Sequence, residues 1–153
     1  YTGDSLVKAP VVQIAGLLRR RKRGIDTESW SWISNMAGMM LFNPPNVSGW
    51  DETRWLDTST FRGRWYIAHQ VCRKESVDVD NEYDEGETSA EALDKALRFW
   101  GQPTLSEPTR DALIGFCVEV AAATPGWAHS EFRAQRQNAL RMLIATSPDL
   151  QTC

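Results

Sequence analysis

The sequence predicts an all-α fold, an irregular bundle of about six helices with a loop rich in proline, glycine and tryptophan between the second and third. Apolar residues recur at helical spacing in six segments. No segment alternates with period two for long enough to make a strand. With 153 residues, 42% of them hydrophobic, the chain can bury one core, so we expect a single domain over residues 1–153.

Proline and glycine set the expected limits of the first two helices. Pro10 opens the first, because proline suits the first helical position, and Gly24 follows where that helix would stop. The second carries apolar residues on one face over residues 30–41. Asn43-Pro44-Pro45 ends it, since neither proline can donate a backbone hydrogen bond and each disfavours helical geometry in the residue before it.

Polar capping residues mark the third and fourth helices. The third is expected to begin after Asp57 or Thr58, where a short polar side chain can cap it. Thr88 and Glu91 have the spacing of a capping box at the start of the fourth, which ends before Gly101. The expected apolar face of the third helix comprises Phe61, Trp65, Ala68 and Cys72.

Two last helices complete the expected bundle. Ser106 is the expected N-cap of the fifth, which Thr124-Pro125-Gly126 breaks. The sixth covers about residues 130–145, and Pro148 stops it. Tryptophans on expected core-facing helical positions are Trp30, Trp65 and Trp100.

An acidic loop is expected at about residues 75–88. Seven acids and almost no large apolar residue lie between residues 75 and 87, so we expect this loop to be solvated. Three of the acids have calcium-loop spacing, but Tyr83 replaces the glycine and Ser89 the final glutamate of such a loop, so we expect no calcium site. The three acids are Asp78, Asp80 and Glu82.

Charge is distributed unevenly within the formal total of −3: residues 1–73 sum to +4 and residues 74–153 to −7. The basic run Arg-Arg-Arg-Lys-Arg at residues 19–23 is typical of nucleic-acid patches. Cations are also favoured at a helix C-terminus, where they normally face water. Because the acidic total opposes phosphate binding, we expect no nucleic-acid partner.

Cysteine usage and hydropathy predict neither a metal site nor a membrane span. Cys72, Cys117 and Cys153 form an odd set without C-x-x-C spacing or neighbouring histidines, and we expect the first two to be buried thiols. The most apolar stretch, residues 113–123, contains Glu119 and has about half the length that crosses a bilayer.

The most informative segment is residues 41–68, LFNPPNVSGWDETRWLDTSTFRGRWYIA. Its prolines and glycines describe a packed irregular loop, with tryptophans available to cover the core. The segment resembles the domain of unknown function 1800 (DUF1800) family, whose phrase F-x-P-P-x-V-x-G-W is followed by W-L/I, by Thr or Ser, and by an Arg in the next helix. Matching positions are Phe42, Pro44, Pro45, Val47, Gly49, Trp50, Trp55, Leu56, Thr58 and Arg64.

Two flanking segments extend the resemblance. Residues 9–12, Ala-Pro-Val-Val, are similar to the family's S-P-V-E-L, and residues 147–151, Ser-Pro-Asp-Leu-Gln, to its terminal S-P-E-F-Q. Residues 51–54, Asp-Glu-Thr-Arg, depart from the family's glycine-rich turn. The resemblance implies that the chain is the C-terminal part of a longer bacterial protein, whose N-terminal remainder would be its partner. Family members often look exported, which makes a secreted or periplasmic location plausible by analogy only and leaves the localisation open.

Aromatic and charged residues in and after the loop are the candidate binding residues. Large rings beside charged groups suit a glycan or peptide platform, because they give contact area with little loss of entropy. The structural interpretation is that the tryptophans cover the core and that the arginine of the next helix donates to loop carbonyls or pairs with Asp57. The candidates are Trp50, Arg54, Trp55, Asp57 and Arg64.

No catalytic set and no cofactor are expected in this chain. His69 and His129 have no partner at metal-ligand spacing, and the chain has no G-x-S-x-G, phosphate-loop or H-E-x-x-H motif. The leading interpretation is therefore a non-catalytic structural or interaction module. The alternative is part of a hydrolase-like or glycan-binding site completed by the N-terminal remainder, which requires Asp51, Asp57 and Arg64 to converge in an exposed cleft.

Overall fold

The computed structural model describes residues 6–24, 30–78, 86–124 and 130–153. Within these ranges the chain forms seven α-helices and two short 3-10 helices, and its only extended pairings are two isolated β-bridges. The prediction of an all-α bundle is confirmed. No helix in the described ranges is long and apolar enough to cross a membrane.

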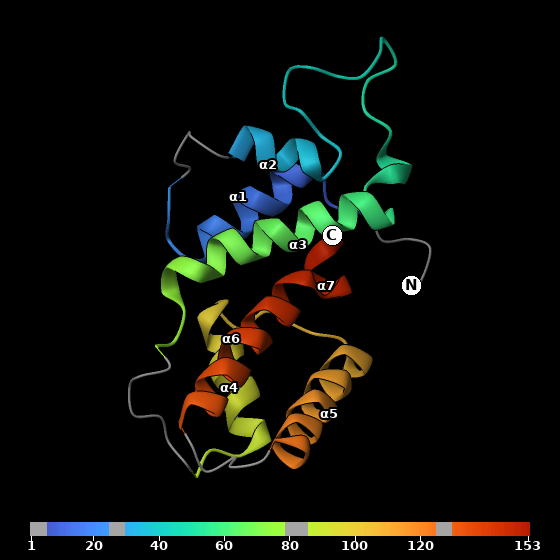
Figure 1. Ribbon diagram of the computed structural model, residues 1–153. Helices are drawn as coiled ribbons and strands as arrows, with labels where there is room; N and C mark the ends of the chain where they lie inside the picture. Colours follow the sequence, from blue (N-terminus) through green and yellow to red (C-terminus); the bar gives the residue numbers. More distant parts are fainter. Residues whose placement is uncertain (1–5, 25–29, 79–85, 125–129) are drawn as a thin grey trace.

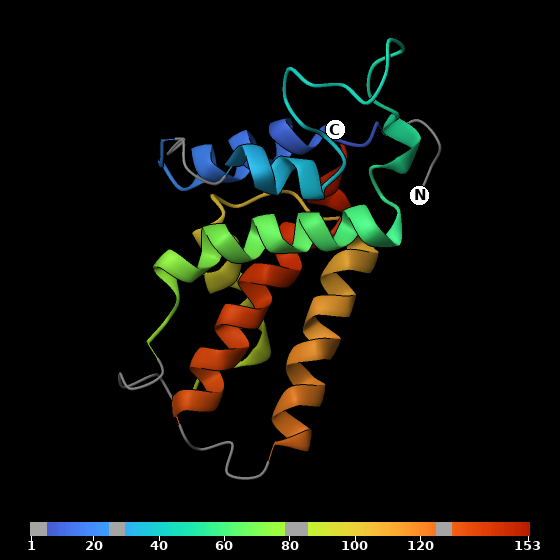
Figure 2. The same cartoon turned by 45° about the horizontal axis from the view of Figure 1, so that its top comes forward.

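The helices form two groups joined across α3 (Figures 1 and 2). Helices α1 and α2 pack on one side of α3, and α6 packs on the other with α4 and α5 beside it. A loop between α2 and η1 projects from the end of the molecule that carries α1 and α2. The bounds are α1 Pro10–Arg20, α2 Trp30–Met36, η1 Glu52–Arg54, α3 Thr58–Cys72, η2 Arg73–Glu75, α4 Ser89–Phe99, α5 Glu107–Ala123, α6 Ser130–Thr146 and α7 Pro148–Gln151.

The predicted helix starts are confirmed by their caps. Pro10 stands in the first turn of α1, and Ser106 has the extended backbone of an N-cap before α5. At α4 the capping box is complete: the backbone N–H of Thr88 donates to Glu91 at 2.8 Å, and the backbone N–H of Glu91 donates to the Thr88 hydroxyl at 3.2 Å. Pro148 follows the end of α6 as predicted and opens the additional short helix α7.

The first two helices end earlier than the sequence predicts. Helix α2 stops at Met36 rather than Leu41, because Gly38 turns into the left-handed region (φ +94°) and the Met39 N–H bonds to the Ser34 carbonyl at 2.9 Å. Helix α1 stops in the same way, with Lys22 (φ +51°) in place of the expected Gly24. Both ends have the hydrogen-bond pattern of a Schellman motif, which satisfies carbonyls of the last turn.

The core follows the helical pattern, although α3 is rotated from its predicted orientation. Its buried face holds Ile67, Ala68, Val71 and Cys72, whereas Phe61 and Trp65, both predicted to face the core, are exposed. The cause is that Gly63 and Arg64 occupy the buried positions facing α1 and α2. Trp100 is fully buried, and its indole N–H donates to the Arg141 carbonyl at 2.9 Å.

Two of the three thiols are buried, as predicted. Cys72 lies in the core, and burial raises its pKa to about 12. Burial likewise raises the pKa of Cys117, whereas Cys153 is exposed. Because the thiolate is the reactive form, the two buried cysteines are chemically quiet at neutral pH.

The basic run was predicted to face water, and this is wrong for Arg21 and Arg23, which are partly buried, whereas Arg20 is exposed and still bonds to the bundle. Arg20 donates to the Trp100 carbonyl at 3.0 Å, and Arg23 donates to the Val71 carbonyl at 3.0 Å. Arg21 bonds to Glu75 and lies over the Phe99 ring, with its guanidinium carbon 3.8 Å from the centroid. These carbonyls lie at the C-terminal ends of α3 and α4, which carry partial negative charge and attract cations. The run therefore joins α1 to the rest of the bundle.

The acidic loop is only partly solvated. Glu87 is buried, and its carboxylate bonds to Arg136 at 2.9 Å and to Lys95 at 2.7 Å. The prediction that the loop is exposed to water is therefore wrong for Glu87. A buried carboxylate persists when cations pair with it, and α4 and α6 supply them here. Residues 79–85, and with them most of the calcium-loop spacing, lie outside the described residues.

Glu75 is expected to make stability depend on pH. Its hydrogen bond with Arg21 is the main cause that lowers the pKa of this carboxylate below its ordinary value. A depressed folded-state pKa contributes stability above the unfolded value, and that contribution is lost as the pH falls through the folded value. Unfolding by urea at a series of pH values from 7 to 3 should show a shallower decline for Glu75→Gln than for the wild type. Because the pair is partly exposed, the difference should be about 1 kcal/mol or less. Parallel curves for the two proteins would contradict this role.

Candidate functional site

A buried arginine organises the end of the molecule where the loop begins and ends. Arg64 on α3 is 0% exposed, and its Nε donates to the Trp55 carbonyl at 2.7 Å. Its Nη2 donates to the Lys8 carbonyl at 2.7 Å. Its Nη1 donates at 3.0 Å to the side-chain oxygens of Gln13 and of Gln151. One guanidinium thus joins the segment before α1, α1 itself, the loop and α7.

Arg64 therefore has a structural place rather than a place in an exposed site. Burial lowers its pKa to about 10, so it stays protonated at neutral pH. The predicted bond to a loop carbonyl is confirmed at Trp55, whereas Asp57 pairs with Arg54 at 3.3 Å instead. Because Arg64 points into the core, it does not converge with Asp51 and Asp57, which are both exposed.

The segment just before α1 and the segment from α7 onward pack together beside this arginine. The Lys8 N–H donates to the Gln151 carbonyl at 2.8 Å, and the Cys153 N–H donates to the Leu6 carbonyl at 3.0 Å. The Gln151 side chain also donates to the Ala145 carbonyl at 2.8 Å, which fixes the oxygen that faces Arg64. The residues on either side of the first flanking segment, Lys8 and Gln13, and the last residue of the second, Gln151, thus all bond to the arginine of the central motif.

The other four candidates divide between the core and the surface. Trp55 is buried at 9% exposure, so it covers the core as the structural interpretation predicts, while Trp50 is half-buried. Arg54 and Asp57 are exposed and paired with each other. The Thr60 hydroxyl donates to the Arg54 carbonyl at 2.6 Å, which fixes the turn between η1 and α3.

A pocket of about 490 Å³ with polar and apolar residues in its lining lies beside the loop, and we call it the loop pocket. The end of α2 and Thr60 of α3 supply one side, and two stretches of the loop supply the other. It contains two of the five sequence candidates, Trp50 and Arg54. The full lining is Asn35, Gly38, Met40, Asn43, Pro44, Pro45, Trp50, Asp51, Arg54 and Thr60.

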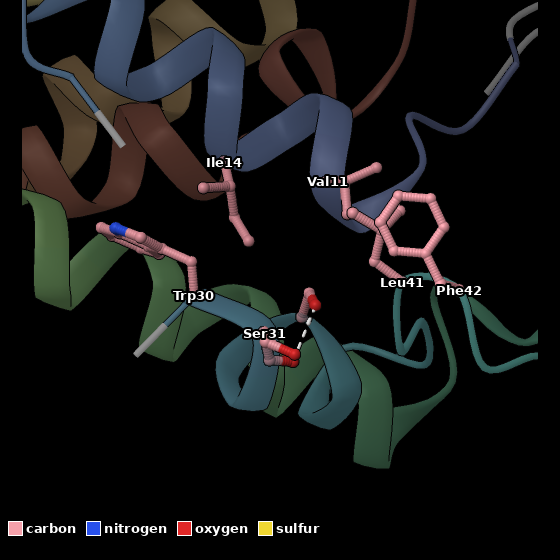
Figure 3. Close-up of a pocket in the computed structure, with 7 residues that line it drawn as sticks. Val11, Ile14, Trp30, Ser31, Leu41 and Phe42 are labelled. Atoms are coloured by element: carbon pink, nitrogen blue, oxygen red, sulfur yellow. Dashed lines mark hydrogen bonds between the residues drawn. The ribbon is translucent and has the colours of Figure 1, made fainter. Parts of the chain in front are cut away.

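An apolar groove of about 360 Å³ lies between α1 and α2 (Figure 3). Ile14 of α1 faces Trp30 across it, while Val11 lies beside Leu41 and Phe42 of the loop, which closes one end. Ser31 and Ser34 are the polar residues of the lining, and the Ser34 hydroxyl donates to the Ser31 carbonyl at 2.9 Å. The full lining is Val11, Ile14, Trp30, Ser31, Ser34, Leu41 and Phe42.

The loop displays apolar side chains at this groove. Phe42 is 91% exposed, and its backbone adopts φ +64°, a left-handed conformation that a bulky residue rarely takes. Val47, farther along the loop, is fully exposed, and Leu41 beside Phe42 is also exposed. Because water is a poor environment for such side chains, this end of the molecule has the character of a contact surface.

Exposed aromatic residues continue along α2 and α3. Trp32, exposed on α2, meets Tyr66 edge to face with ring centroids 6.0 Å apart, and His69 stacks on Tyr66 at 6.1 Å. The sequence reasoning did not select Trp32, Val11 or Leu41 as site residues. A usable signal was present for Trp32, which lies two positions after the core-facing Trp30 and so falls on the opposite side of a helix.

Within the part of the chain that the structure describes, no group of three or more histidine, cysteine or carboxylate side chains has metal-binding geometry. His129 lies outside the described residues. Asp51 accepts bonds from the backbone and hydroxyl of Thr53, at 3.1 and 2.6 Å, so this carboxylate caps η1. The exposed polar residues therefore supply hydrogen bonds and balanced charge, which suit binding.

Comparison with protein families connects the whole chain to one of them. Residues 2–152 match the family described as protein of unknown function (DUF1800). Comparisons with curated proteins and with solved structures found no match. The matched range includes the proline and tryptophan loop, Arg64 and both flanking segments. The chain therefore belongs to the DUF1800 family of proteins of unknown function.

Proposed function

We propose that this DUF1800 chain is a non-catalytic interaction module that packs against the N-terminal remainder of its parent protein. The contact surface comprises the apolar groove between α1 and α2 and the projecting side chains of Leu41 and Phe42. The remainder would insert apolar side chains between Val11 and Trp30, and the loop would close over them. The polar groups of the loop pocket lie outside this contact.

The observation that carries the proposal is the exposure of Phe42 at the mouth of the groove. Burying a phenylalanine side chain stabilises a protein by about 1.5–3 kcal/mol. An exposed phenylalanine with a strained backbone does not provide this stabilisation. A packed partner would recover it. Large apolar patches at a hollowed surface mark protein contacts more often than chance exposure does.

The position of the groove favours a segment of the same protein as its occupant. Val7 pairs with Thr152 beside Arg64, and only two residues separate it from the start of α1. A preceding segment would therefore enter close to Val11 and could reach the groove without a long linker. The two helices that form the walls, PVVQIAGLLRR and WSWISNM, contain no carboxylate, so nothing there repels an apolar or acidic segment.

Thiol accessibility in the parent protein tests the proposal. Cys153, which is exposed, is first replaced by serine to remove its reaction. Cys72 and Cys117 can stay, because they are buried and unreactive. Phe42→Cys is then introduced into this chain and into the intact parent, and the rate of reaction with Ellman's reagent is measured. We expect the reaction to be at least about tenfold slower in the parent, because packing restricts access to the thiol.

Val118→Cys is the matched control, because Val118 is an exposed apolar residue on α5, distant from the groove. Its reaction rate should be the same in the two proteins. Leu41→Cys provides a second position at the groove and should be protected like Phe42→Cys. Equal rates at both groove positions in the chain and the parent would refute the packing, whatever the behaviour of the control.

A further inference from the structure

The loop pocket offers hydrogen-bonding groups of both kinds in one hollow. Asn35 and Asn43 present exposed carboxamides, each of which can donate and accept. Asp51 supplies carboxylate acceptors and Arg54 supplies guanidinium donors. Thr53 uses Oδ1 of Asp51, and no described residue bonds to Oδ2, so that oxygen is available to a ligand.

Apolar surface lies directly beside these polar groups. Pro44, Pro45 and Trp50 form part of the lining, so the pocket combines apolar residues with polar ones. A volume of about 490 Å³ falls within the usual range for small-molecule sites. Ligands with the matching character have C–H faces that pack on rings and hydroxyls around the edge.

Charge in the loop pocket is balanced. Asp51 and Arg54 contribute one charge of each sign, and Arg54 also pairs with the adjacent Asp57. An anion would be repelled by the carboxylates, and a cation would compete with an arginine that is already in place. A wholly apolar ligand would leave several polar groups without hydrogen bonds, which is costly. A neutral ligand rich in hydroxyl groups avoids all three costs.

We infer that the loop pocket binds a neutral carbohydrate. The sugar ring packs on Trp50 and the two prolines, while its hydroxyls bond to Asn35, Asp51 and Arg54. This site is separate from the apolar groove, because the two linings share no residue. It does not depend on the proposed packing against the parent protein.

Titration calorimetry and NMR on this chain test the inference with three probes: cellohexaose, maltohexaose and N-acetylchitohexaose. At least one should bind with a millimolar or lower dissociation constant. In amide-detected spectra it should shift the side-chain signals of Asn35 and Asn43 and leave the indole signal of the buried Trp100 unchanged. Because the ligand is neutral, affinity should change less than about twofold between 0.05 and 0.5 M salt.

Two conservative variants examine the contacts. Asn35→Ala and Asp51→Asn alter exposed side chains, so both should remain folded, and each should weaken binding at least about fivefold through loss of a hydrogen bond. Gln135→Ala removes an exposed amide on α6 and should bind like the wild type. The inference is overturned if none of the three probes binds at 10 mM, a concentration of the order of weak millimolar affinity. It is also overturned if binding is the same in both pocket variants, or if affinity falls steeply with salt.

Discussion

Replacing Arg64 by methionine is expected to lower the free energy of unfolding by about 3–5 kcal/mol, because the change removes the donors of a buried cluster. Carbonyls of Lys8 and Trp55 and the side-chain oxygens of Gln13 and Gln151 would be left buried without this partner. Methionine has a similar volume although it is shorter, so most of the loss would report hydrogen bonds rather than a cavity. Urea-induced unfolding followed by tryptophan fluorescence measures it.

Two further variants show whether geometry or charge matters at this position. Arg64→Lys keeps the charge but cannot reproduce the planar fork that reaches several acceptors, so it should recover less than half of the loss. Arg62→Met, two residues earlier on the same helix and exposed, should change stability by less than about 0.5 kcal/mol. If Arg64→Met were within 1 kcal/mol of the wild type, the cluster would not hold the segment before α1, α7 and the loop together.

Gly63→Ala is expected to destabilise the protein by about 3 kcal/mol, although alanine is the better helix former. A Cβ at this position would lie 2.4 Å from the Met36 carbonyl carbon and 2.5 Å from the Ala37 nitrogen. Both are backbone atoms at the end of α2, so no side chain can move aside. The two helices would have to separate, which would disturb the apolar groove as well as the core. Thermal and urea unfolding measure the effect.

Gly115→Ala provides the opposite result in the same protein. Gly115 lies within α5, and an added Cβ would meet no atom within 4 Å. Here only the backbone preference operates, and stability should rise by about 0.5–1 kcal/mol. The contrast isolates the contact between α2 and α3 as the cause. A Gly63→Ala protein as stable as the wild type would show that these helices do not pack as closely as described.

Much of the fold could be predicted because the signals are local. Proline at Pro10, the capping box at Thr88 and the N-cap at Ser106 act within one turn of chain, so each is visible in the sequence. Helix ends were predicted less well. Glycine at residue 24 was the expected stop, but Lys22 takes the left-handed position, and the arginines on either side of it, Arg21 and Arg23, bond to carbonyls of other helices.

The five candidate binding residues do not form one group in the structure. Sequence reasoning selected Trp50, Arg54, Trp55, Asp57 and Arg64 as one group, and the structure divides them between a pocket, an exposed ion pair and the core. The rotation of α3 accounts for the place of Arg64, which is the one candidate on that helix. Periodicity predicted that the buried face of α3 carries Phe61 and Trp65. In the structure α2 approaches α3 closely at Gly63, so a different face of the helix is buried.

The sequence by itself determined the helical class, the caps, the buried thiols and the membership of the DUF1800 family, because each depends on neighbouring residues or on a contiguous motif. Only the tertiary structure decided that Arg64 joins the segment before α1 to α7, that the basic run binds helix ends, and that Phe42 stands exposed at a groove. These features depend on contacts between residues far apart in the chain. Burial and the geometry of the partners decide which contacts form, and the conformational preferences of single residues do not reveal them.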